Sequence, residues 1–250
     1  MVEVCHYAHR PAPCSVAVGL FDKLDGPRLI GVITYGGAAN QTLRTGVCGP
    51  SEMNNVIELS RLWVEDGTPV YECVDRNGKA RATSVESFFI SRSFHFVDKE
   101  IIVAYADPGA TNLAFQSKQP HLGIIYQATN WIYTGQGIPF KDPYLKNRPE
   151  LHHTSIPSEC RDKKTIPGVI ICLGCKQHFN AKPKKGEPRF SLKKALEEIF
   201  PGQVEWRDRA RKHRYVHFNN GKNLRLSEWR RRRGELEAKL RYPNLPYPKA

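Results

Sequence analysis

The sequence contains no run of apolar residues that approaches the roughly 20 needed to cross a bilayer as a helix. Its N-terminus has no cationic segment followed by an apolar one, which is the pattern of a secretory signal peptide. It has no internal repeat, and its seven cysteines are odd in number and irregularly spaced. These absences exclude a membrane-spanning protein and a disulfide-stabilised secreted domain, so we expect a cytoplasmic protein with reduced thiols.

Acidic residues are scarce in the second half of the chain. Residues 1–140 contain 11 Lys/Arg and 13 Asp/Glu, a net charge of −2, whereas residues 141–250 contain 27 Lys/Arg and 12 Asp/Glu, a net charge of +15. The net charge of the whole chain is +13. Such concentration indicates a surface that binds a polyanion rather than a merely solvated basic surface. Nucleic acid is favoured over a membrane, because the helix candidates of this half are short and break at proline and glycine.

Hydrophobic residues make up 40% of the chain, which is enough for a packed core. Period-two and period-3.6 patterns predict secondary structure along the first half, with a loop through Pro50 after the second strand. The expected strands are 15–21, 28–35, 55–64, 100–106 and 131–134, and the expected helices are 84–96 and 121–130. This order predicts a mixed α/β core in residues 1–140.

The second half, residues 141–250, has a different texture, with frequent lysine and proline. It offers helices at 191–200 and 227–240, a strand at 214–218 and a proline-rich tail. We expect it to be a basic DNA-binding extension that packs against the core.

Reactive side chains stand at the boundaries of several predicted elements. Asp107 follows the apolar strand 100–106, where open α/β sheets place ligands. Each candidate has a structural alternative: Asp107 as a cap, Arg61 as a paired arginine, Tyr126 as a core tyrosine. The remaining candidates are His6, Tyr7 and His9 near the N-terminus, which could be surface residues, and His121 before Tyr126.

Six short motifs occur in an order that resembles the Mom family of bacteriophage DNA-modification proteins. They cover most of residues 5–137 and a patch near 212–215. The motifs are His6-Tyr7, Glu58-Leu59-Ser60-Arg61-Leu62, Ser87-Phe88-Phe89-Ile90-Ser91-Arg92, Tyr105-Ala106-Asp107, the stretch from Tyr126 to Gly135, and Lys212-His213-Arg214-Tyr215.

This resemblance implies an acetyltransferase-like (GNAT) fold with a mostly antiparallel central sheet and flanking helices. It also implies conversion of adenine in DNA to N6-carbamoylmethyladenine, which shields phage DNA from host restriction enzymes. Acetyl-CoA and iron are implied cofactors. The implied residues are His6, Tyr7, Arg61, Asp107 and Tyr126 for catalysis, His6, Tyr7 and Asp107 for iron, and Ser60, Ser91 and Arg92 for cofactor binding.

Two features depart from the family pattern. An ordinary acetyltransferase follows its central strand with a glycine-rich loop that binds the coenzyme pyrophosphate at a helix N-terminus. Here Val64 is followed by Glu65-Asp66-Gly67-Thr68-Pro69, which weakens the expectation of coenzyme A. The stretch from Thr111 to Gln119 looks like an insertion.

The implied chemistry requires an activated and accessible adenine. The N6 amine is a poor nucleophile and is paired in duplex DNA, so the base must be flipped out. We expect Asp107 to accept the N6–H, His6 and Tyr7 to transfer protons or bind iron, and Arg61 to bind an anionic donor group.

The basic half supplies the predicted DNA contacts, which should be mainly to phosphates. The partners are double-stranded DNA and an unidentified small-molecule donor, without a membrane, and a homodimer is left open. The predicted DNA-binding residues are Arg207, Arg209, Arg211, Lys212, Arg214, Arg230, Arg231, Arg232 and Arg233. Alternatives to a DNA-modifying enzyme are a conventional acetyltransferase and a non-catalytic DNA-binding accessory protein.

A second metal site is suggested by the spacing C-x11-C-x2-C-x2-H. The C-x2-C pair is typical of zinc knuckles. Buried free cysteines are the alternative, because only one such pair is present. The predicted zinc ligands are Cys160, Cys172, Cys175 and His178.

Overall fold

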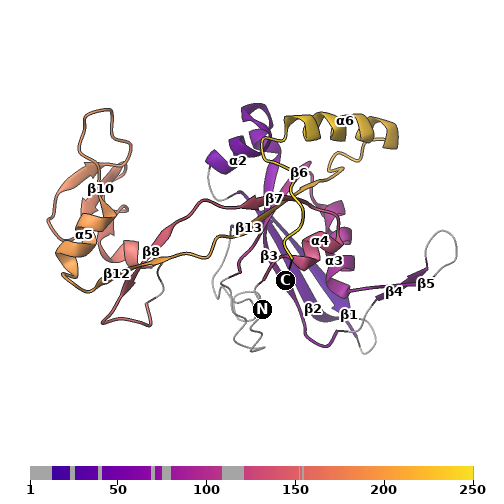
Figure 1. Ribbon diagram of the computed structural model, residues 1–250, viewed down its shortest axis with the longest axis horizontal. Helices are drawn as coiled ribbons and strands as arrows, with labels where there is room; N and C mark the ends of the chain where they lie inside the picture. The colour runs from indigo at the N-terminus through magenta and orange to yellow at the C-terminus, as the bar shows by residue number, and fades with distance from the viewer. Residues whose placement is uncertain are drawn as a thin grey trace. The chain divides into compact units, whose positions relative to one another are not determined.

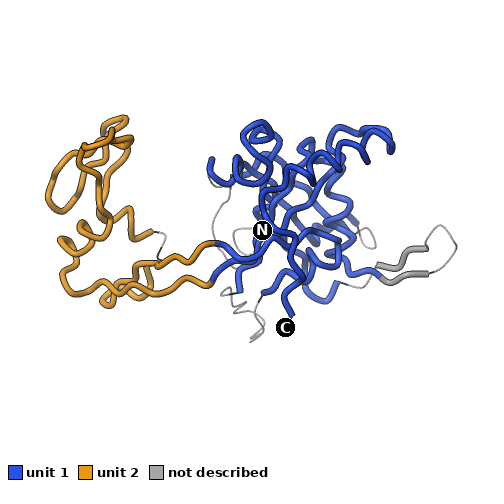
Figure 2. The backbone as a smooth tube through the Cα atoms, turned by 45° about the horizontal axis from the view of Figure 1, so that its top comes forward, with its two compact units in different colours: residues 1–137, 211–250 blue, residues 138–210 orange. Residues whose placement is uncertain are grey.

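The computed structural model describes residues 13–22, 26–38, 41–68, 71–74, 80–108, 121–151, 153 and 155–249 (Figure 1). The chain divides into two compact units, shown in different colours in Figure 2. Unit 1 comprises residues 1–137 and 211–250, and unit 2 comprises residues 138–210. Among the described residues, no helix is long and apolar enough to cross a membrane.

Unit 1 is built on a six-stranded sheet with the order β1-β2-β3-β6-β13-β7. All neighbours are antiparallel except β3 and β6, which are parallel. The strands are β1 (Val16–Asp22), β2 (Arg28–Gly36), β3 (Val56–Val64), β6 (Ile101–Ala106), β13 (His213–Phe218) and β7 (Ile132–Gln136). The predicted mixed α/β fold with a mostly antiparallel sheet is confirmed.

Helices cover both faces of this sheet (Figure 1). One apolar cluster joins the sheet to α2 and α6 through Leu43, Val47 and Leu236, and another joins it to α3 and α4 through Phe89 and Tyr126. The helices are α2 (Gln41–Cys48), η1 (Pro50–Asn55), α3 (Val85–Ser93), η2 (Phe94–Phe96), α4 (Ile124–Ala128) and α6 (Leu226–Lys239). A separate antiparallel pair is formed by β4 (Tyr71–Val74) and β5 (Ala80–Thr83).

The central strand β6 pairs with β13, a strand more than 100 residues away in the sequence. Ile101, Ile102, Val103 and Ala104 are fully buried, as the continuous apolar pattern of β6 predicts. Because β13 pairs with β6 on one side and with β7 on the other, residues after 210 complete the core of unit 1.

Two sequence predictions in unit 1 were wrong in their element boundaries. The loop expected through Pro50 contains α2 and η1, because Leu43 and Val47 provide a one-turn-spaced apolar stripe that packs on the sheet. The helix expected over 121–130 is shortened to Ile124–Ala128. It begins after Gly123, whose φ is 75°, and ends before Asn130, whose φ is 58°.

A β-bulge in β3 changes which face its side chains occupy. Thr34 of β2 is opposite Arg61, but the next residue, Tyr35, is opposite Leu59, so Ser60 is the extra residue. Beyond the bulge Leu62 packs on the same core as Leu59. The alternation of residues 55–64 in the sequence predicts Arg61 on the apolar face with Leu59, and this prediction is wrong because the bulge turns Arg61 to the opposite face.

Unit 2 is a small α/β unit with its own core. Fully buried Leu145, Ile156, Cys160 and Leu196 form its centre. Two sheets contribute, β12-β8 and β11-β10-β9. The elements are β8 (Lys141–Leu145), η3 (Ile156–Glu159), β9 (Arg161–Asp162), β10 (Val169–Cys172), β11 (His178–Asn180), α5 (Leu192–Ile199) and β12 (Val204–Asp208).

Candidate active site

Charged and aromatic side chains meet where β6 ends and β13 begins. Asp107 directly follows β6, and its Oδ2 lies 3.1 Å from the Nζ of Lys212. The next residue, His213, pairs with Ala106 of β6 on one side and with Gln136 of β7 on the other. The antiparallel register therefore brings an acid, an ammonium group and an imidazole to the same end of the strand pair β6 and β13.

The imidazole of His213 is held by a neighbouring tyrosine. The Tyr133 hydroxyl and His213 Nδ1 share a hydrogen bond of 2.8 Å, and Gln136 Nε2 lies 3.4 Å from His213 Nε2. Burial lowers the pKa of His213 and raises the pKa of Tyr133. Both groups are therefore neutral near pH 7, and the imidazole retains an unprotonated nitrogen that can accept a proton.

His121 belongs to the same electrostatic group. Burial lowers its pKa, the Asp107 carboxylate opposes this shift, and His213 adds to it. Asp107 and His213 are thus near enough to His121 to influence its charge. A neutral His121 beside an anionic Asp107 provides two proton acceptors of different strength in one place.

Tyr126, in α4, packs against aromatic residues beside this group. It is 5% exposed, and its ring lies 5.1 Å from that of Tyr215 and 5.0 Å from that of Trp131. The approach is close because Gly123 has no side chain, since a Cβ there would lie 2.6 Å from Tyr215 and 2.9 Å from Tyr126. The geometry gives Tyr126 a packing role beside the candidate site.

Arg61 lies on the face of β3 that carries Glu58, opposite to that of Leu59 and Leu62. Its Nη1 donates to the Ser60 carbonyl at 2.7 Å. On the same face of neighbouring β6, the pKa of Tyr105 is raised by burial to about 12 and is influenced by Glu58. Arg61 therefore shares a sheet face with Glu58 and Tyr105, while Tyr126 belongs to the opposite face.

The parallel pairing of β3 with β6 stops beside the bulge. It extends from Val56 with Ile101 to Leu59 with Ala104, although β3 continues to Val64. Each of the three residues predicted to bind a cofactor contacts a residue close to it in the sequence. Ser60 Oγ donates to the Glu58 carbonyl at 3.3 Å, Ser91 Oγ donates to the Ser87 carbonyl at 2.8 Å, and the Arg92 guanidinium lies 5.5 Å from the Phe88 ring.

His6 and Tyr7 lie outside the described residues, so their predicted roles are neither supported nor contradicted. Tyr133 and His213 were not among the predicted catalytic residues. Both occur within motifs that carried the family resemblance, and this membership was the signal for them.

The predicted DNA-binding residues of α6 have two different environments. Arg230, Arg231 and Arg233 are exposed. Arg232 is buried at 18% side-chain exposure and binds Glu52 at 2.8 Å and Glu100 at 2.9 Å. Arg232 is therefore an internal anchor of α6, and its neighbours are the ones whose charge faces solvent.

Of the remaining predicted residues in unit 1, Arg211 and Arg214 contact the chain itself. The Arg211 Nε donates to the Gly137 carbonyl at 2.7 Å. The Arg214 guanidinium lies 3.4 Å from the centre of the Tyr242 ring and donates to Thr134 Oγ1 at 2.8 Å. Arg211 remains exposed, whereas Arg214 is half-buried.

In unit 2 the predicted arginines pair with acids. Arg207 binds Glu205 at 2.8 Å, and Arg209 forms a bidentate pair with buried Asp142. A continuous strand would place Arg207, Arg209 and Arg211 on one face, but β12 ends at Asp208, so only Arg207 lies within it.

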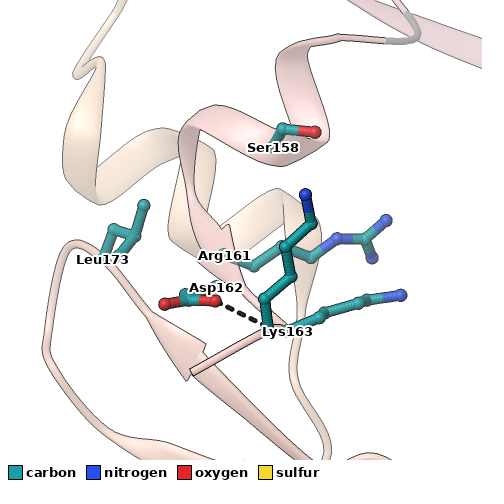
Figure 3. Close-up of a pocket in the computed structure, with 6 residues that line it drawn as sticks. Ser158, Arg161, Asp162, Lys163 and Leu173 are labelled. Carbon is teal, nitrogen blue, oxygen red and sulfur yellow. Dashed lines mark hydrogen bonds between the residues drawn. The ribbon is translucent and has the colours of Figure 1, made fainter. Parts of the chain in front are cut away.

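Unit 2 also has a cleft that the sequence did not indicate, here called the basic cleft (Figure 3). The Asp162 carboxylate within it accepts hydrogen bonds from the backbone N–H groups of Lys164 and Thr165, so this acid shapes the turn. The lysine side chains remain exposed. The lining residues are Ser158, Arg161, Asp162, Lys163, Lys164 and Leu173.

The predicted zinc ligands are brought together only in part. Among the described residues, one group has metal-ligand spacing, and it consists of Cys172, Cys175 and Glu198, whose ligand atoms lie within 4.8 Å of one another. Cys160 is fully buried, and its thiol donates to the Ile156 carbonyl at 3.4 Å. His178 is exposed on β11. Glu198 was missed because it is 23 residues beyond Cys175 in a helix whose pattern indicates only amphipathicity.

Comparison with known proteins gives one finding. No curated protein matches the chain. The family model described as the Mom protein family matches residues 1–249, which includes both units. The chain therefore belongs to the Mom protein family, a membership that implies modification of adenine in phage DNA.

Proposed function

We propose that the protein is an enzyme that converts adenine in double-stranded DNA to N6-carbamoylmethyladenine and so protects phage DNA from restriction in the cytoplasm of the bacterial host. Family membership supports the substrate. The observation that carries the assignment of the site is the group formed by Asp107, Lys212, His213 and Tyr133 at the end of β6. The carboxylate and the neutral imidazole can each accept a proton from an amine, and the ammonium group can hold the carboxylate in place.

In this proposal Asp107 faces the exocyclic amine of a flipped adenine. Its carboxylate accepts the N6–H, and the proton leaves to it or to a neutral imidazole as the new N6–carbon bond forms and the bond between the methylene carbon of the donor and its leaving group breaks. Lys212, 3.1 Å away, keeps the carboxylate in place. Tyr126 positions α4, and with it His121, by packing between Tyr215 and Trp131. The carbamoylmethyl donor is unidentified, and the polar group around Arg61 on the other face suits an anionic one.

Iron does not fit Asp107 well in this arrangement. The carboxylate already holds the Lys212 ammonium at 3.1 Å, and a second cation would have to displace it. His6 and Tyr7, the other two residues implied for iron, lie outside the described residues. We therefore assign Asp107 to the adenine and base no step on iron.

Acetyl-CoA binding of the ordinary kind does not fit the turn that follows β3. Glu65 in that turn is exposed and pairs with Arg28 at 2.8 Å, so it presents negative charge where a pyrophosphate would need backbone N–H groups and a helix N-terminus. The pairing of β3 with β6 ends at Leu59, and we place the donor between the two strands beyond that residue. No step of the proposed reaction depends on coenzyme A.

DNA affinity is assigned to exposed cations of both units. In unit 1 these are the exposed arginines of α6, and in unit 2 they are Lys163 and Lys164 of the basic cleft, beside half-buried Arg161. Because neither set is arranged as a bidentate reader of base edges, we expect phosphate contacts and strong salt dependence.

The test is expression in a bacterium followed by mass spectrometry of the nucleosides in its DNA. We expect wild-type protein to yield the carbamoylmethyl mass increase on adenine. Asp107→Ala should reduce the yield at least about 100-fold, because positioned proton acceptors contribute on the order of 10²–10⁴ in rate. Asp98→Ala is the matched control, since this exposed acid pairs with the neighbouring Lys99 at 3.5 Å and should leave the yield unchanged.

Two outcomes would contradict the proposal. Folded, DNA-binding wild-type protein that leaves adenine unmodified would point to a DNA-binding accessory protein. Acetylation of a substrate without DNA would point to a conventional acetyltransferase. Wild-type yield from the Asp107→Ala protein would remove the assigned site while leaving the reaction in place.

A further inference from the structure

Unit 2 contains a hairpin whose turn brings two sulfurs together. Strands β10 and β11 pair with Ile171 opposite His178, and residues 173–177 connect them. The turn is closed at both ends, because Lys176 N–H donates to the Cys172 carbonyl at 2.9 Å and Cys172 N–H donates to the Gln177 carbonyl at 3.0 Å. Lys176 adopts a φ of 62°, which reverses the chain directly after Cys175.

The backbone of this turn is also arranged to support a thiolate. The Gln177 N–H donates to the Cys175 sulfur, and this hydrogen bond favours the charged form. Cys172 is buried, whereas Cys175 and Glu198 are exposed, so three groups that can each become anionic lie together where a cation can reach them.

Helix α5 supplies the third group. The Cys172 thiol lies 3.8 Å from Glu198 Oε2. The turn packs tightly on this helix, because a Cβ at Gly174 would lie 3.0 Å from Ile199 Cγ1 and 3.2 Å from Glu198 Oε2. The hairpin and α5 thus hold their side chains in a fixed relation.

We propose that Cys172, Cys175 and Glu198 bind one zinc ion. Thiolates select zinc over magnesium and calcium, and a carboxylate completes zinc sites at about 2.0–2.2 Å. Ligands on a tetrahedron with Zn–S distances of about 2.3 Å are roughly 3.8 Å apart. The three ligand atoms here, within 4.8 Å of one another, need only a small closure. A water molecule or another ligand takes the fourth position.

This ligand set replaces two residues that spacing alone suggests. Cys160 donates its thiol proton to the Ile156 carbonyl, and burial raises its pKa to about 11, so it is a core thiol. His178 follows the closed turn and is exposed. Cys160 and His178 therefore serve as internal controls for the site.

The zinc ion would have a structural consequence for the basic cleft. Cys172 pairs in the β-sheet with Arg161, and Leu173 lies in the wall of the cleft. Unit 2 has a small core, and cores of this size commonly depend on a metal or a disulfide. Zinc would fasten the hairpin to α5 and keep the cleft in shape, whether or not the protein modifies adenine.

The test measures zinc in the purified full-length chain by mass spectrometry of the metals, with zinc salt as the only added probe. We expect about one equivalent in the wild-type protein, retained in Cys160→Ser, His178→Ala and Cys14→Ser, the last an exposed cysteine of unit 1. The Cys175→Ser and Glu198→Gln variants should each lose more than about 100-fold in zinc affinity. This is more than the roughly 10–100-fold lost with a residue that only hydrogen-bonds to a metal ligand.

Two further measurements keep the test decisive if a variant folds poorly. Removal of metal from the wild-type protein by a chelator should lower a thermal transition, and added zinc should restore it. Cobalt substitution should give a charge-transfer band with the intensity of two thiolates, unchanged by Cys160→Ser. Wild-type protein without zinc would overturn the proposal. Zinc lost on Cys160→Ser or His178→Ala but kept on Glu198→Gln would overturn the ligand set.

Discussion

Glu100 shows how a single buried charge organises unit 1. Its side chain has no exposed surface, and it accepts hydrogen bonds from Asn55 at 2.7 Å and Arg232 at 2.9 Å. Burial alone would raise the pKa of Glu100, but these partners together with Lys222 hold it below its ordinary value. An ionised carboxylate at the start of β6 therefore depends on an arginine from α6.

We predict that Arg232→Ala destabilises the protein by about 3–5 kcal/mol, because it leaves buried carboxylates without their cation. Arg231→Ala, which breaks only an exposed pair with Glu235, should change stability by less than about 0.5 kcal/mol. Urea unfolding of both variants at pH 7 measures the difference. Equal losses from the two variants would show that Arg232 is not an anchor.

The same network should give the protein a defined acid sensitivity. The partners of Glu52, chiefly Arg232, lower its pKa from 4.5 to about 2. A carboxyl whose pKa is depressed in the fold adds stability above pH 4.5 and loses it as the pH falls toward 2. The difference in the free energy of unfolding between the wild-type and Arg232→Ala proteins should therefore narrow as the pH falls from 4.5 toward 2. A difference that does not change with pH would contradict the role of Arg232.

At the residue scale, sequence reasoning identified the residue types of the site but not their partners. An arginine run such as 230–233 has the same appearance whether a member faces solvent or a buried acid. Only the meeting of α6 with the start of β6 and η1 distinguishes Arg232 from its neighbours. Asp107 was predicted from its place after a buried strand, whereas its partner Lys212 is 105 positions away.

At the element scale, β-rich and periodic patterns predicted the strands β1, β2 and β3 and the helix α3, and a continuous apolar run predicted β6. Ser84 does accept the N–H of Ser87 as an N-cap. The bulge at Ser60 was not predictable, because alternation in β3 is readable only against the register of β2. It matters for the site, since it turns Arg61 to the opposite face of the sheet and lies where the pairing of β3 with β6 ends.

We predict that deleting Ser60 preserves the fold but reduces adenine modification. The deletion makes the pairing with β2 continuous and leaves Leu62 and Val64 on the core face, while it removes the kink beside the site. The thermal midpoint and the yield of modified nucleoside measure the two effects. Ser60→Ala is the control that keeps the bulge.

An insertion gives the opposite expectation. One alanine added after Ser60 gives β3 two extra residues, so Leu62 and Val64 must slip by two residues from their partners Ile33 and Gly31 in β2, and this slip should cost about 2–5 kcal/mol. If the deletion and the insertion destabilise the protein equally, the bulge has no role in phasing β3. Full modification by the deletion variant would separate the bulge from the site.

At the scale of the whole molecule, the sequence indicated a basic second half, and the structure divides that charge between two units. Residues 138–210 contain 15 Lys/Arg and 9 Asp/Glu, and residues 211–250 contain 12 and 3. Composition cannot reveal that β13 returns to pair with β6, because the pairing joins segments distant in sequence. Unit 2 is therefore an insertion between two adjacent strands of unit 1.

The ends of this insertion are adjacent. Gly137 N–H donates to the Lys212 carbonyl at 2.9 Å, and Arg211 donates to the Gly137 carbonyl at 2.7 Å. A short glycine-serine linker can therefore replace residues 138–210. We predict that the shortened protein folds with a thermal midpoint within a few degrees of that of unit 1 in the full chain, because no strand of the six-stranded sheet is removed.

DNA binding should change in a measurable way when unit 2 is weakened. Each phosphate contact contributes about 0.9 to the slope of log K against log salt, so Lys163→Ala/Lys164→Ala should lower the slope by about two. Lys184→Ala/Lys185→Ala removes the same charge from the same unit outside the basic cleft and should change the slope less. Equal changes would mean that unit 2 attracts DNA through its net charge, and then the cleft has no special part in binding.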